Sequence, residues 1–373
     1  MRKLLFLFSL ILSGTLCAQN GFTDRALAKN TLMDTVKIGK WIEYLDEDLN
    51  PVKDSTGAPL YVLVEYKGGK PWGKENTFYT NGRLYRIRTL VNGLANGPVK
   101  AYYEDGKLLG DGTYLNGVKK GPVTFYYPNG KIKMKAVYSN DKLSGIMNGY
   151  YENGKLKSIL VFADGLEEGI GKEYYETGLL TSETNYLHGE RNGIATEYYP
   201  NGKVMKKASY VHDMLNGIFR EYYENDSLMS EVPYLNDSVN GTVKEYGKSG
   251  KLVDEVKYVN GQKTGLAREW YESGKIMKEI PYAGDSVHGK SKVYFESGVL
   301  MMEANYNNGA ETGVSKEYYG DGKMKSETSF KDGKKDGLEK HYFETGKPQS
   351  ETIWKDDVQV SYKFYDADGK EIK

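Results

Sequence analysis

The sequence predicts an all-β protein: an elongated repeat array of 24-residue β-hairpins that forms a continuous twisted antiparallel meander. Three observations predict this fold. Glycine and tyrosine are in excess, with 44 and 33 residues among 373. Glycine recurs in two series at steps of 24 residues, and a pair of adjacent aromatic residues precedes one series in most units. Because repetition at a fixed period is typical of repeat architectures, we expect one array rather than two or three ordinary domains.

The overall composition excludes several classes of protein. Basic and acidic residues balance at 51 each. No basic excess is present to neutralise a phosphate backbone, so we expect no nucleic-acid partner. The hydrophobic fraction of 39% is too low for a membrane-spanning bundle, whereas the aromatic fraction of 13% is too high for a disordered chain.

Residues 1–18 are expected to be a secretory signal peptide. Arg2 and Lys3 precede an apolar run that starts at Leu4, and the small residue Ala18 marks the expected cleavage position. The mature protein is therefore expected to be exported by a bacterium, to the periplasm, the outer surface or the medium. Lipidation at Cys17 is the alternative. Leu16 disfavours it, because lipoprotein signals place a small residue before the cysteine.

Cleavage after Ala18 changes the chemistry open to the mature chain. It removes the single cysteine, so neither a disulfide nor a thiolate metal site is expected. It also leaves 49 basic and 51 acidic residues, a net charge of −2. No later apolar run is long enough to span a bilayer, so we expect no transmembrane segment after cleavage. Residues 19–38 are a lead-in to the array.

The array is expected to fill residues 39–373 in about 13 to 14 units, with an enlarged loop near residues 46–59. Two glycine columns define the units and are expected at chain reversals, where a positive φ favours glycine. Asp226 replaces glycine once, and aspartate tolerates the same conformation. The glycines assigned to turns are Gly97, Gly121, Gly145, Gly193 and Gly217 in one column and Gly106, Gly130, Gly154, Gly178 and Gly202 in the other.

The motif Tyr-Tyr-Glu-Asp-Gly-Lys-Leu predicts the hairpin register. A three-residue loop at residues 104–106 pairs Tyr103 with Lys107 and Tyr102 with Leu108. Strict alternation then places Tyr102, Leu108 and a third aromatic column, which includes Tyr114, on one face. We predict that this face is the packing face.

The opposite face is predicted to be solvated and is the candidate binding face. It carries the second tyrosine column, a glutamate column and the lysine after each glycine. Tyrosines that half-cover a thin sheet, with Glu–Lys pairs that keep it soluble, explain this pattern. Flat amphipathic rings flanked by charges are also typical of binding surfaces. The candidate residues are Tyr103, Tyr127, Tyr151, Tyr175, Tyr199, Tyr223, Tyr271, Tyr319, Glu173, Glu197, Glu221, Glu245 and Glu269.

The repeat unit resembles a known family. Tyr-Tyr-Glu-Asn-Gly-Lys-Leu-Lys at residues 150–157 and Tyr-Leu-Asn-Gly-Val-Lys-Lys-Gly at residues 114–121 are similar to the MORN-repeat variant, the bacterial form of the membrane occupation and recognition nexus repeat. Bacterial chains of this kind are often labelled YwqK-type antitoxins. The resemblance covers roughly residues 39–373. It implies a β-hairpin array and little about function, because the family is grouped by its repeat.

No motif in the sequence indicates catalysis, a cofactor or a metal. His188 and His212 occupy the same position one repeat apart, ~10 Å from each other, which is too far to share one metal at ~2.1 Å bonds. Carboxylates are plentiful but belong to repeated columns, without the local cluster expected of an active site. We therefore expect no catalytic residues, no cofactor and no metal site.

The sequence favours an exported, non-enzymatic repeat scaffold that binds a protein or a cell-envelope component through its Tyr/Glu/Lys face. Two alternatives stay open. One is a carbohydrate-binding protein whose tyrosine column stacks on sugar rings. The other is an antitoxin or immunity-type protein that binds a toxin.

Overall fold

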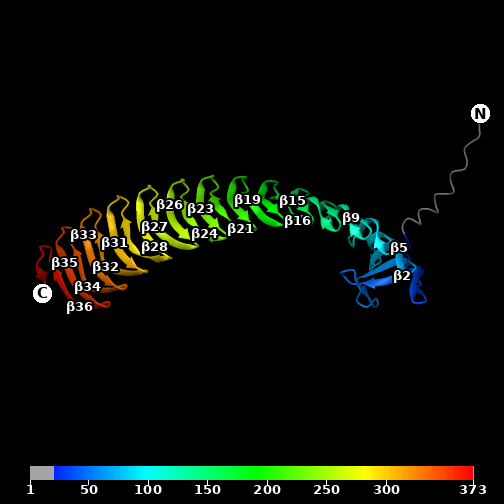
Figure 1. Cartoon of the computed structure of the whole chain (residues 1–373), viewed down its shortest axis with the longest axis horizontal. Helices are drawn as coiled ribbons and strands as arrows, with labels where there is room; N and C mark the ends of the chain where they lie inside the picture. The colour runs from blue at the N-terminus through cyan, green and yellow to red at the C-terminus, as the bar shows by residue number, and fades with distance from the viewer. Residues whose placement is uncertain (1–20, 373) are drawn as a thin grey trace, which may run out of the picture. The chain divides into compact units, whose positions relative to one another are not determined.

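The computed structural model describes residues 21–372. The predicted signal peptide, including Cys17, lies outside the described residues. The chain divides into two compact units, the first ending at Glu190 and the second beginning at Arg191. In each unit, strands follow one another side by side and pair antiparallel (Figure 1). The prediction of an all-β hairpin array is therefore confirmed.

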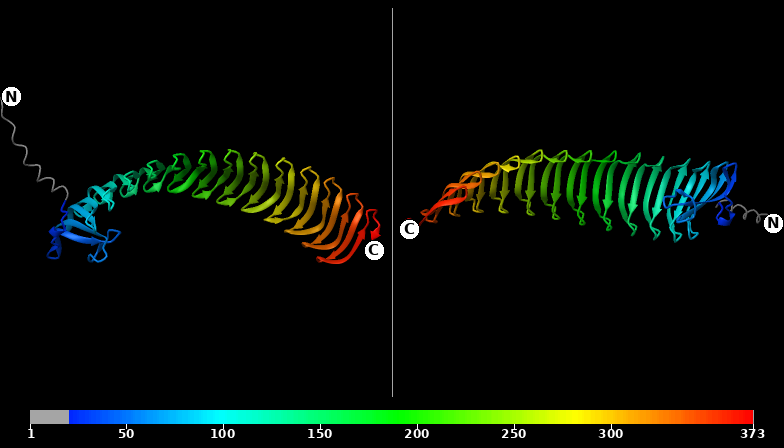
Figure 2. Two further views of the ribbon diagram at one scale, coloured as in Figure 1. Left: turned by 180° about the vertical axis from the view of Figure 1, so that it is seen from behind. Right: turned by 90° about the horizontal axis from the view of Figure 1, so that it is seen from below.

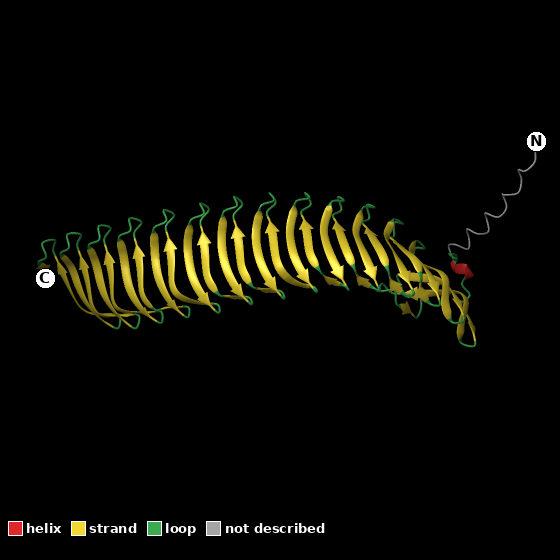
Figure 3. Cartoon of the chain, turned by 45° about the horizontal axis from the view of Figure 1, so that its top comes forward, coloured by secondary structure: helices red, strands yellow, loops and turns green. Residues whose placement is uncertain are grey.

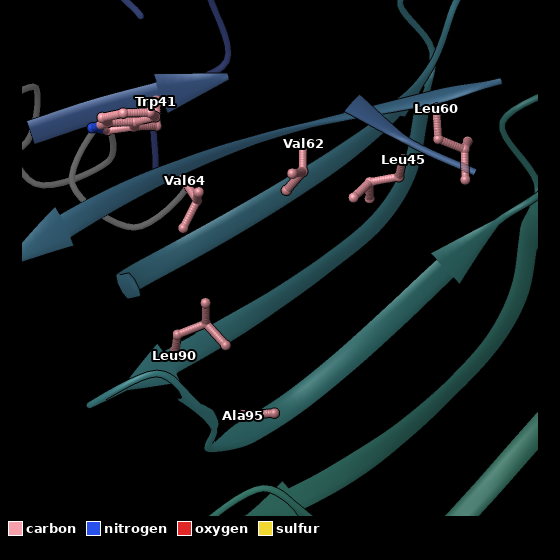
Figure 4. Packing of buried hydrophobic residues seen from close by; sticks show 7 residues of the cluster. All are labelled: Trp41, Leu45, Leu60, Val62, Val64, Leu90 and Ala95. Carbon is pink, nitrogen blue, oxygen red and sulfur yellow. The ribbon is translucent and has the colours of Figure 1, made fainter. Parts of the chain in front are cut away.

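The N-terminal part of unit one is the most deeply packed region of the chain. It contains a 3₁₀ turn η1 (Arg25–Leu27) and the strands β1 (Thr31–Met33), β2 (Val36–Leu45), β3 (Pro51–Val52), β4 (Leu60–Lys67) and β5 (Lys70–Tyr79). Residues 46–59 connect β2 to β4 and include β3. One cluster packs on one side of β4, with Trp41, Leu45, Leu60, Val62, Val64, Leu90 and Ala95 at its centre (Figure 4). A second cluster contains Phe22, Tyr61, Leu63 and Phe78.

The remaining strands repeat one pattern. Those of unit one are β6 (Leu84–Val91), β7 (Leu94–Ala95), β8 (Gly97–Tyr102), β9 (Leu108–Leu115), β10 (Val118–Lys119), β11 (Gly121–Tyr126), β12 (Ile132–Ser139), β13 (Lys142–Leu143), β14 (Gly145–Tyr150), β15 (Leu156–Ala163), β16 (Leu166–Glu167), β17 (Gly169–Tyr174) and β18 (Leu180–Leu187).

Unit two continues this pattern. Its strands are β19 (Glu190–Tyr198), β20 (Val204–Val211), β21 (Met214–Leu215), β22 (Gly217–Tyr222), β23 (Leu228–Leu235), β24 (Ser238–Val239), β25 (Gly241–Tyr246), β26 (Leu252–Val259), β27 (Gln262–Trp270), β28 (Ile276–Ala283), β29 (Ser286–Val287), β30 (Gly289–Tyr294), β31 (Leu300–Asn307), β32 (Ala310–Tyr318), β33 (Met324–Lys331), β34 (Lys334–Tyr342), β35 (Pro348–Lys355), β36 (Val358–Tyr365) and β37 (Glu371–Ile372).

The first chain reversal of each 24-residue repeat is the predicted three-residue loop. The Tyr103 amide donates to the Lys107 carbonyl at 2.8 Å, and Tyr102 pairs with Leu108. Gly106 has a φ of 87°, and Asp226, which stands at the same position, has a φ of 72°. The residue before the glycine also closes the loop, because Asp105 Oδ1 accepts a hydrogen bond from the Lys107 amide at 3.0 Å. In Figure 3, loops join the ends of successive strands along the chain.

The second reversal lies four residues earlier than the glycine column assigned to it. Leu115 pairs with Val118, so the turn consists of Asn116 and Gly117, with φ values of 52° and 89°. An Asn-Gly pair tolerates positive φ at both positions and therefore closes a two-residue hairpin turn. Gly121 has a φ of 90° but begins β11. The column of Gly97 and Gly121 thus starts strands rather than forming the turns.

A β-bulge in each 24-residue repeat changes the predicted side-chain faces. Tyr102 pairs with Leu108 but Ala101 pairs with Gly110, so Leu109 has no partner of its own. Beyond this extra residue the side chains exchange faces. The prediction that Tyr114 shares a face with Tyr102 is therefore wrong, because the bulge moves the third aromatic column to the other face.

Packing confirms this reassignment. In unit two, the ring of Phe219 contacts that of Tyr234 edge-on, with centroids 6.3 Å apart. Phe219 lies two residues before Glu221 on the same strand, so the third aromatic column shares the face of the glutamates. Most of the small buried residues also lie there, among them Val123, Ala136, Ala208, Val256, Ala267 and Ala304. The predicted packing face was therefore wrong: the glutamate-bearing face is the more buried of the two.

Candidate binding groove

The face that carries the glutamates forms a shallow groove, here called the groove face. Its floor consists of small and aliphatic residues that pair directly across neighbouring strands. In unit two these pairs are Ala195 with Ala208, Val243 with Val256, Ala267 with Ile280 and Ser291 with Ala304. Small floor residues between two aromatic columns leave space along the strands' midline.

The third aromatic column is one wall of the groove. Cationic side chains from the preceding strand cover several of its rings. The Arg191 guanidinium carbon lies 4.1 Å from the Tyr210 ring centroid, and Lys263 Nζ lies 5.2 Å from that of Tyr282. Cation–π contacts of this kind stabilise the pairing of adjacent strands and give this wall a positive rim.

The second tyrosine column, predicted as the candidate binding residues, is the other wall. Its rings are half-buried, and their hydroxyls bind the next repeat. Tyr103, Tyr127 and Tyr151 in unit one donate to the backbone carbonyls of Tyr126, Tyr150 and Tyr174 at 2.6, 2.7 and 2.6 Å. In unit two, Tyr199, Tyr223, Tyr271 and Tyr319 donate to the carbonyls of Tyr222, Tyr246, Tyr294 and Tyr342. Tyr175 is half-buried in the same column.

These hydrogen bonds restrict what the column can offer a ligand. A tyrosine hydroxyl has one proton, and here it is donated to the neighbouring hairpin. The tyrosine can therefore offer a ligand the surface of its ring but no free hydrogen-bond donor. The column therefore has a structural role that its spacing did not reveal.

The predicted glutamates differ in their surroundings. Glu173 and Glu197 are exposed. Glu221 accepts from the Ser230 hydroxyl at 3.3 Å, and Glu269 lies 2.7 Å from Lys278 Nζ. Glu245 is exposed and pairs across the strands with Asp254.

Asp254, which the sequence did not single out, is the most perturbed carboxyl on this face. It lies directly between Glu245 on β25 and Glu269 on β27. Partial burial and these two negative neighbours raise its pKa to about 6, and Lys263 opposes this shift. Only the register of three consecutive strands brings the three carboxyls together. Sequence spacing identified two of them as members of a column but gave no reason to combine them with Asp254.

These carboxyls border a recess on the groove face of unit two. Its volume is about 360 Å³, and its floor includes Val256 and Ala267. Tyr258 and Tyr282 line one side and Lys263 and Lys278 its rim. The combination of an apolar floor, aromatic sides and mixed charges at the rim is typical of a binding surface.

Two further recesses lie along the same face. One, of about 220 Å³, is lined by Ile280, Val293, Met302 and Tyr306 among others. The other, of about 350 Å³, is lined by Phe295, Met301, Met302, Glu317, Tyr319 and Lys325 among others. Met302 borders both, so the two recesses adjoin, and their methionines add adaptable apolar surface.

The opposite face carries most of the cross-strand ion pairs. Arg220 Nε lies 2.7 Å from Glu231 Oε1. Arg268 bridges Glu255 and Glu279 at 3.2 and 3.4 Å. These charges compensate one another across neighbouring strands, so the polar residues of this face are largely satisfied by the sheet itself.

Neither a metal centre nor a helical membrane span was found in the part of the chain that the structure describes. Between residues 21 and 372, no group of three or more His, Cys, Asp or Glu side chains could hold a metal ion. Over the same residues, no helix is sufficiently long and apolar to cross a bilayer.

Comparison with known proteins defines the class of this chain. The family model described as the MORN repeat variant matches eleven segments, at residues 95–116, 119–140, 143–164, 167–188, 191–212, 215–236, 239–260, 263–283, 287–308, 311–332 and 335–356. The chain therefore belongs to the MORN repeat variant family, as its repeat motif predicted. Each matched segment contains one of the three-residue loops and the strands on either side of it.

Similarity to individual proteins is weak. No match was found among curated proteins. The crystal structure of TcdB2-TccC3-Cdc42 is similar at 11% identity with a TM-score of 0.16, over 87% of this chain and 21% of that one. The structure of TcdB2-TccC3 is similar at 12% identity with a TM-score of 0.16, over 88% of this chain and 22% of that one. The chain spans about a fifth of the length of these structures.

Proposed function

We propose that this protein is an exported, non-enzymatic repeat scaffold that binds another protein or a cell-envelope component along the groove face of unit two. The observation that carries the proposal is the row of three recesses on one face. All three combine apolar and aromatic lining residues, and two of them also have charged residues in their lining. An elongated row suits an extended polypeptide better than a compact small molecule, since a small ligand needs only one enclosed pocket.

Export is supported by the sequence features of residues 1–18 alone. Cell fractionation of the full chain and of a variant without residues 2–18 tests it. We expect the full chain in the envelope or the medium and the shortened chain in the cytoplasm. Cytoplasmic retention of both would contradict export.

Photocrosslinking in intact cells tests binding. A photoreactive phenylalanine analogue at Met301 places the probe in a recess, and the same analogue at Leu266 places it on the opposite face, where that side chain is 38% exposed. We expect mass spectrometry to identify a discrete crosslinked partner from the Met301 probe and not from the Leu266 probe. Equal crosslinking from both positions would contradict a groove-specific interaction.

A glycan array with the purified protein addresses the carbohydrate alternative. Saturable glycan binding that is lost in Ala267→Trp would favour a carbohydrate ligand. If no protein crosslink is found as well, the partner would be a carbohydrate rather than a protein. Ala267 is the test position because it forms the buried floor of the recess beside Asp254.

A further inference from the structure

The walls and floor of the groove face in unit two recur at a fixed spacing. We propose that this face binds a proline-rich segment in the polyproline II conformation, lying across the strands with one helical turn per repeat and a basic residue beside Asp254. This inference rests on the proposed function, which gives an extended polypeptide as the partner. It adds the conformation and the composition of that polypeptide.

Two of the recesses are equivalent sites in consecutive repeats. Val256 and Tyr282 line the recess beside Asp254. Ile280 and Tyr306, each 24 residues further along the chain, line the recess of about 220 Å³. A ligand that occupies both recesses in the same way must therefore present the same kind of side chain at the spacing of the repeats.

This spacing selects among the conformations of a bound polypeptide. Strands of unit two lie side by side in Figure 2, and each repeat adds one hairpin to the sheet. At ~4.8 Å per strand, equivalent positions are ~9.6 Å apart. A polyproline II helix has three residues per turn at ~3.1 Å each, which gives ~9.3 Å per turn. A β-strand repeats one face every ~6.6 Å and an α-helix turns every ~5.4 Å, so both lose register at the next repeat.

The walls of the groove suit a polyproline II ligand. Tyr271 and Phe295 present half-buried rings on one wall, and Tyr258 and Tyr282 do so on the other. Proline rings pack on flat aromatic rings of this kind, and the preformed helix loses little entropy on binding. Its backbone makes no internal hydrogen bonds, so its carbonyls are free acceptors. Within residues 191–372, the hydroxyls of Tyr258 and Tyr282 donate to no protein group and are therefore available to these carbonyls.

The carboxyls beside the first of these recesses determine the charge of the partner. Lys278 Nζ lies 2.7 Å from Glu269 Oε2. Among the described residues, Glu245 and Asp254 have no ion-pair partner, and Lys263, the other cation of this recess, lies over an aromatic ring. A lysine or arginine of the ligand would supply the missing positive charge.

An interruption of the second tyrosine column places this basic residue. Gly247 stands 24 residues after Tyr223 and 24 before Tyr271, two residues beyond Glu245. A Cβ at this glycine would meet no atom closer than 3.6 Å. The wall thus lacks one ring beside the unpaired carboxyls. The opening gives a long basic side chain a path to Glu245 and Asp254.

Fluorescence anisotropy with labelled synthetic peptides tests this proposal on the purified chain. The probe is a peptide of five Pro-Pro-Lys triplets, which we expect to bind saturably. Five Gly-Gly-Lys triplets keep the charge but are flexible, and five Pro-Pro-Glu triplets keep the conformation but reverse the charge. Both are expected to bind at least tenfold more weakly. Absence of saturable binding by the probe, or equal binding by the flexible peptide, would overturn the proposal.

A pair of charge-reversal variants tests the position of the ligand. Asp254→Lys is expected to weaken binding of the Pro-Pro-Lys peptide at least tenfold. Glu224→Lys makes the same change in charge in an exposed loop and is expected to leave the affinity unchanged. Circular dichroism of both variants checks that they fold. Equal affinities of the two variants would contradict a ligand beside Asp254.

The crosslinks from Met301 separate this inference from the proposed function. If no partner is captured, the proposed function fails, and the peptide titrations still decide whether the groove prefers polyproline II. If a partner is captured, mass spectrometry of the crosslinked peptide identifies the bound segment. We expect prolines at intervals of three residues and a lysine or arginine among them. A segment without prolines would overturn this inference and leave the proposed function in place.

Discussion

The hydroxyl of Tyr103 donates a hydrogen bond of 2.6 Å to the backbone carbonyl of Tyr126, 23 residues further along the chain. The same contact recurs in both units, and it links the end of one hairpin to the end of the next. Lysine adds a parallel link at the loops, since Lys131 Nζ donates to the Asn153 carbonyl at 2.8 Å. Because a repeat array is stabilised by interfaces between neighbours, these bonds are expected to contribute directly to its stability.

Removal of one such hydroxyl is expected to destabilise the array locally. Tyr127→Phe leaves the Tyr150 carbonyl without the donor that now lies 2.7 Å away, and the expected loss is about 1 kcal/mol. Hydrogen exchange of β14 amides and denaturant unfolding measure it. Tyr138→Phe is the control: within the described residues the Tyr138 ring contacts Lys119, but its hydroxyl makes no hydrogen bond. Equal effects of the two changes would argue against a role for the bond.

Addition of a missing hydroxyl is expected to stabilise unit two. Phe295 occupies the second tyrosine position and lies 23 residues before Tyr318, but it has no hydroxyl to donate. Phe295→Tyr is expected to add about 0.5–1 kcal/mol to the free energy of unfolding. Phe125→Tyr, at a 37% exposed position outside this column, is expected to have no effect. A neutral or destabilising Phe295→Tyr would contradict the prediction.

Asp226 is the one residue other than glycine in the column that closes the three-residue loops, and it allows the cost of a positive φ to be tested. Asp226 has a φ of 72°, which strains an L-residue, so Asp226→Gly is expected to stabilise by about 0.5–1 kcal/mol. The ion pair that it loses, Lys203 with Asp226 at 3.0 Å, is largely exposed and worth little. Gly106→Ala is the inverse change. A Cβ there meets no atom within 4 Å, so the expected loss of about 1 kcal/mol reflects φ alone. Thermal unfolding of both variants checks the two signs.

Asp254 makes stability depend on pH. Its pKa in the folded protein, about 6, lies above the unfolded value near 3.8, so between these values the native state holds more protons than the unfolded state. The free energy of unfolding is therefore expected to fall as pH rises from 4 through 6. Asp254→Asn removes this dependence and is expected to stabilise at pH 7 by about 1 kcal/mol, after allowance for solvent screening of a half-exposed group.

The control for this prediction is Asp105→Asn. Hydrogen bonds from Lys107 lower the pKa of Asp105, so this change is expected to destabilise at pH 7 and to leave the dependence near pH 6 intact. Denaturant unfolding of the three proteins at pH 5 and pH 7 separates the outcomes. An Asp254→Asn variant with the wild-type pH dependence would show that another group is responsible.

Much of the fold follows from local chemistry. A 24-residue period, Asn-Gly pairs and a glycine after two tyrosines predict hairpins, because each feature acts on its own few residues through φ and the turn that it permits. The pairing of Tyr102 with Leu108 was predicted correctly for this reason. The family was also evident from the motif at residues 150–157.

The side-chain faces could not be predicted from alternation. One unpaired residue, Leu109, moves Tyr114 to the other face, and nothing in the sequence near Leu109 signals a bulge. Because Tyr114 was assigned to the wrong face, the packing face was also predicted wrongly. For the same reason, the third aromatic column was not recognised as a wall of the candidate groove. The binding residues were chosen as a column of exposed rings. In the structure, their hydroxyls are committed to neighbouring hairpins.

The sequence by itself determined the repeat, the turns and the antiparallel pairing, since these depend on interactions within a few residues of one another. Only the tertiary structure decided which columns share a face and that Asp254 lies between Glu245 and Glu269. These properties depend on register between strands and on contacts across repeats, where one extra residue changes every side chain that follows.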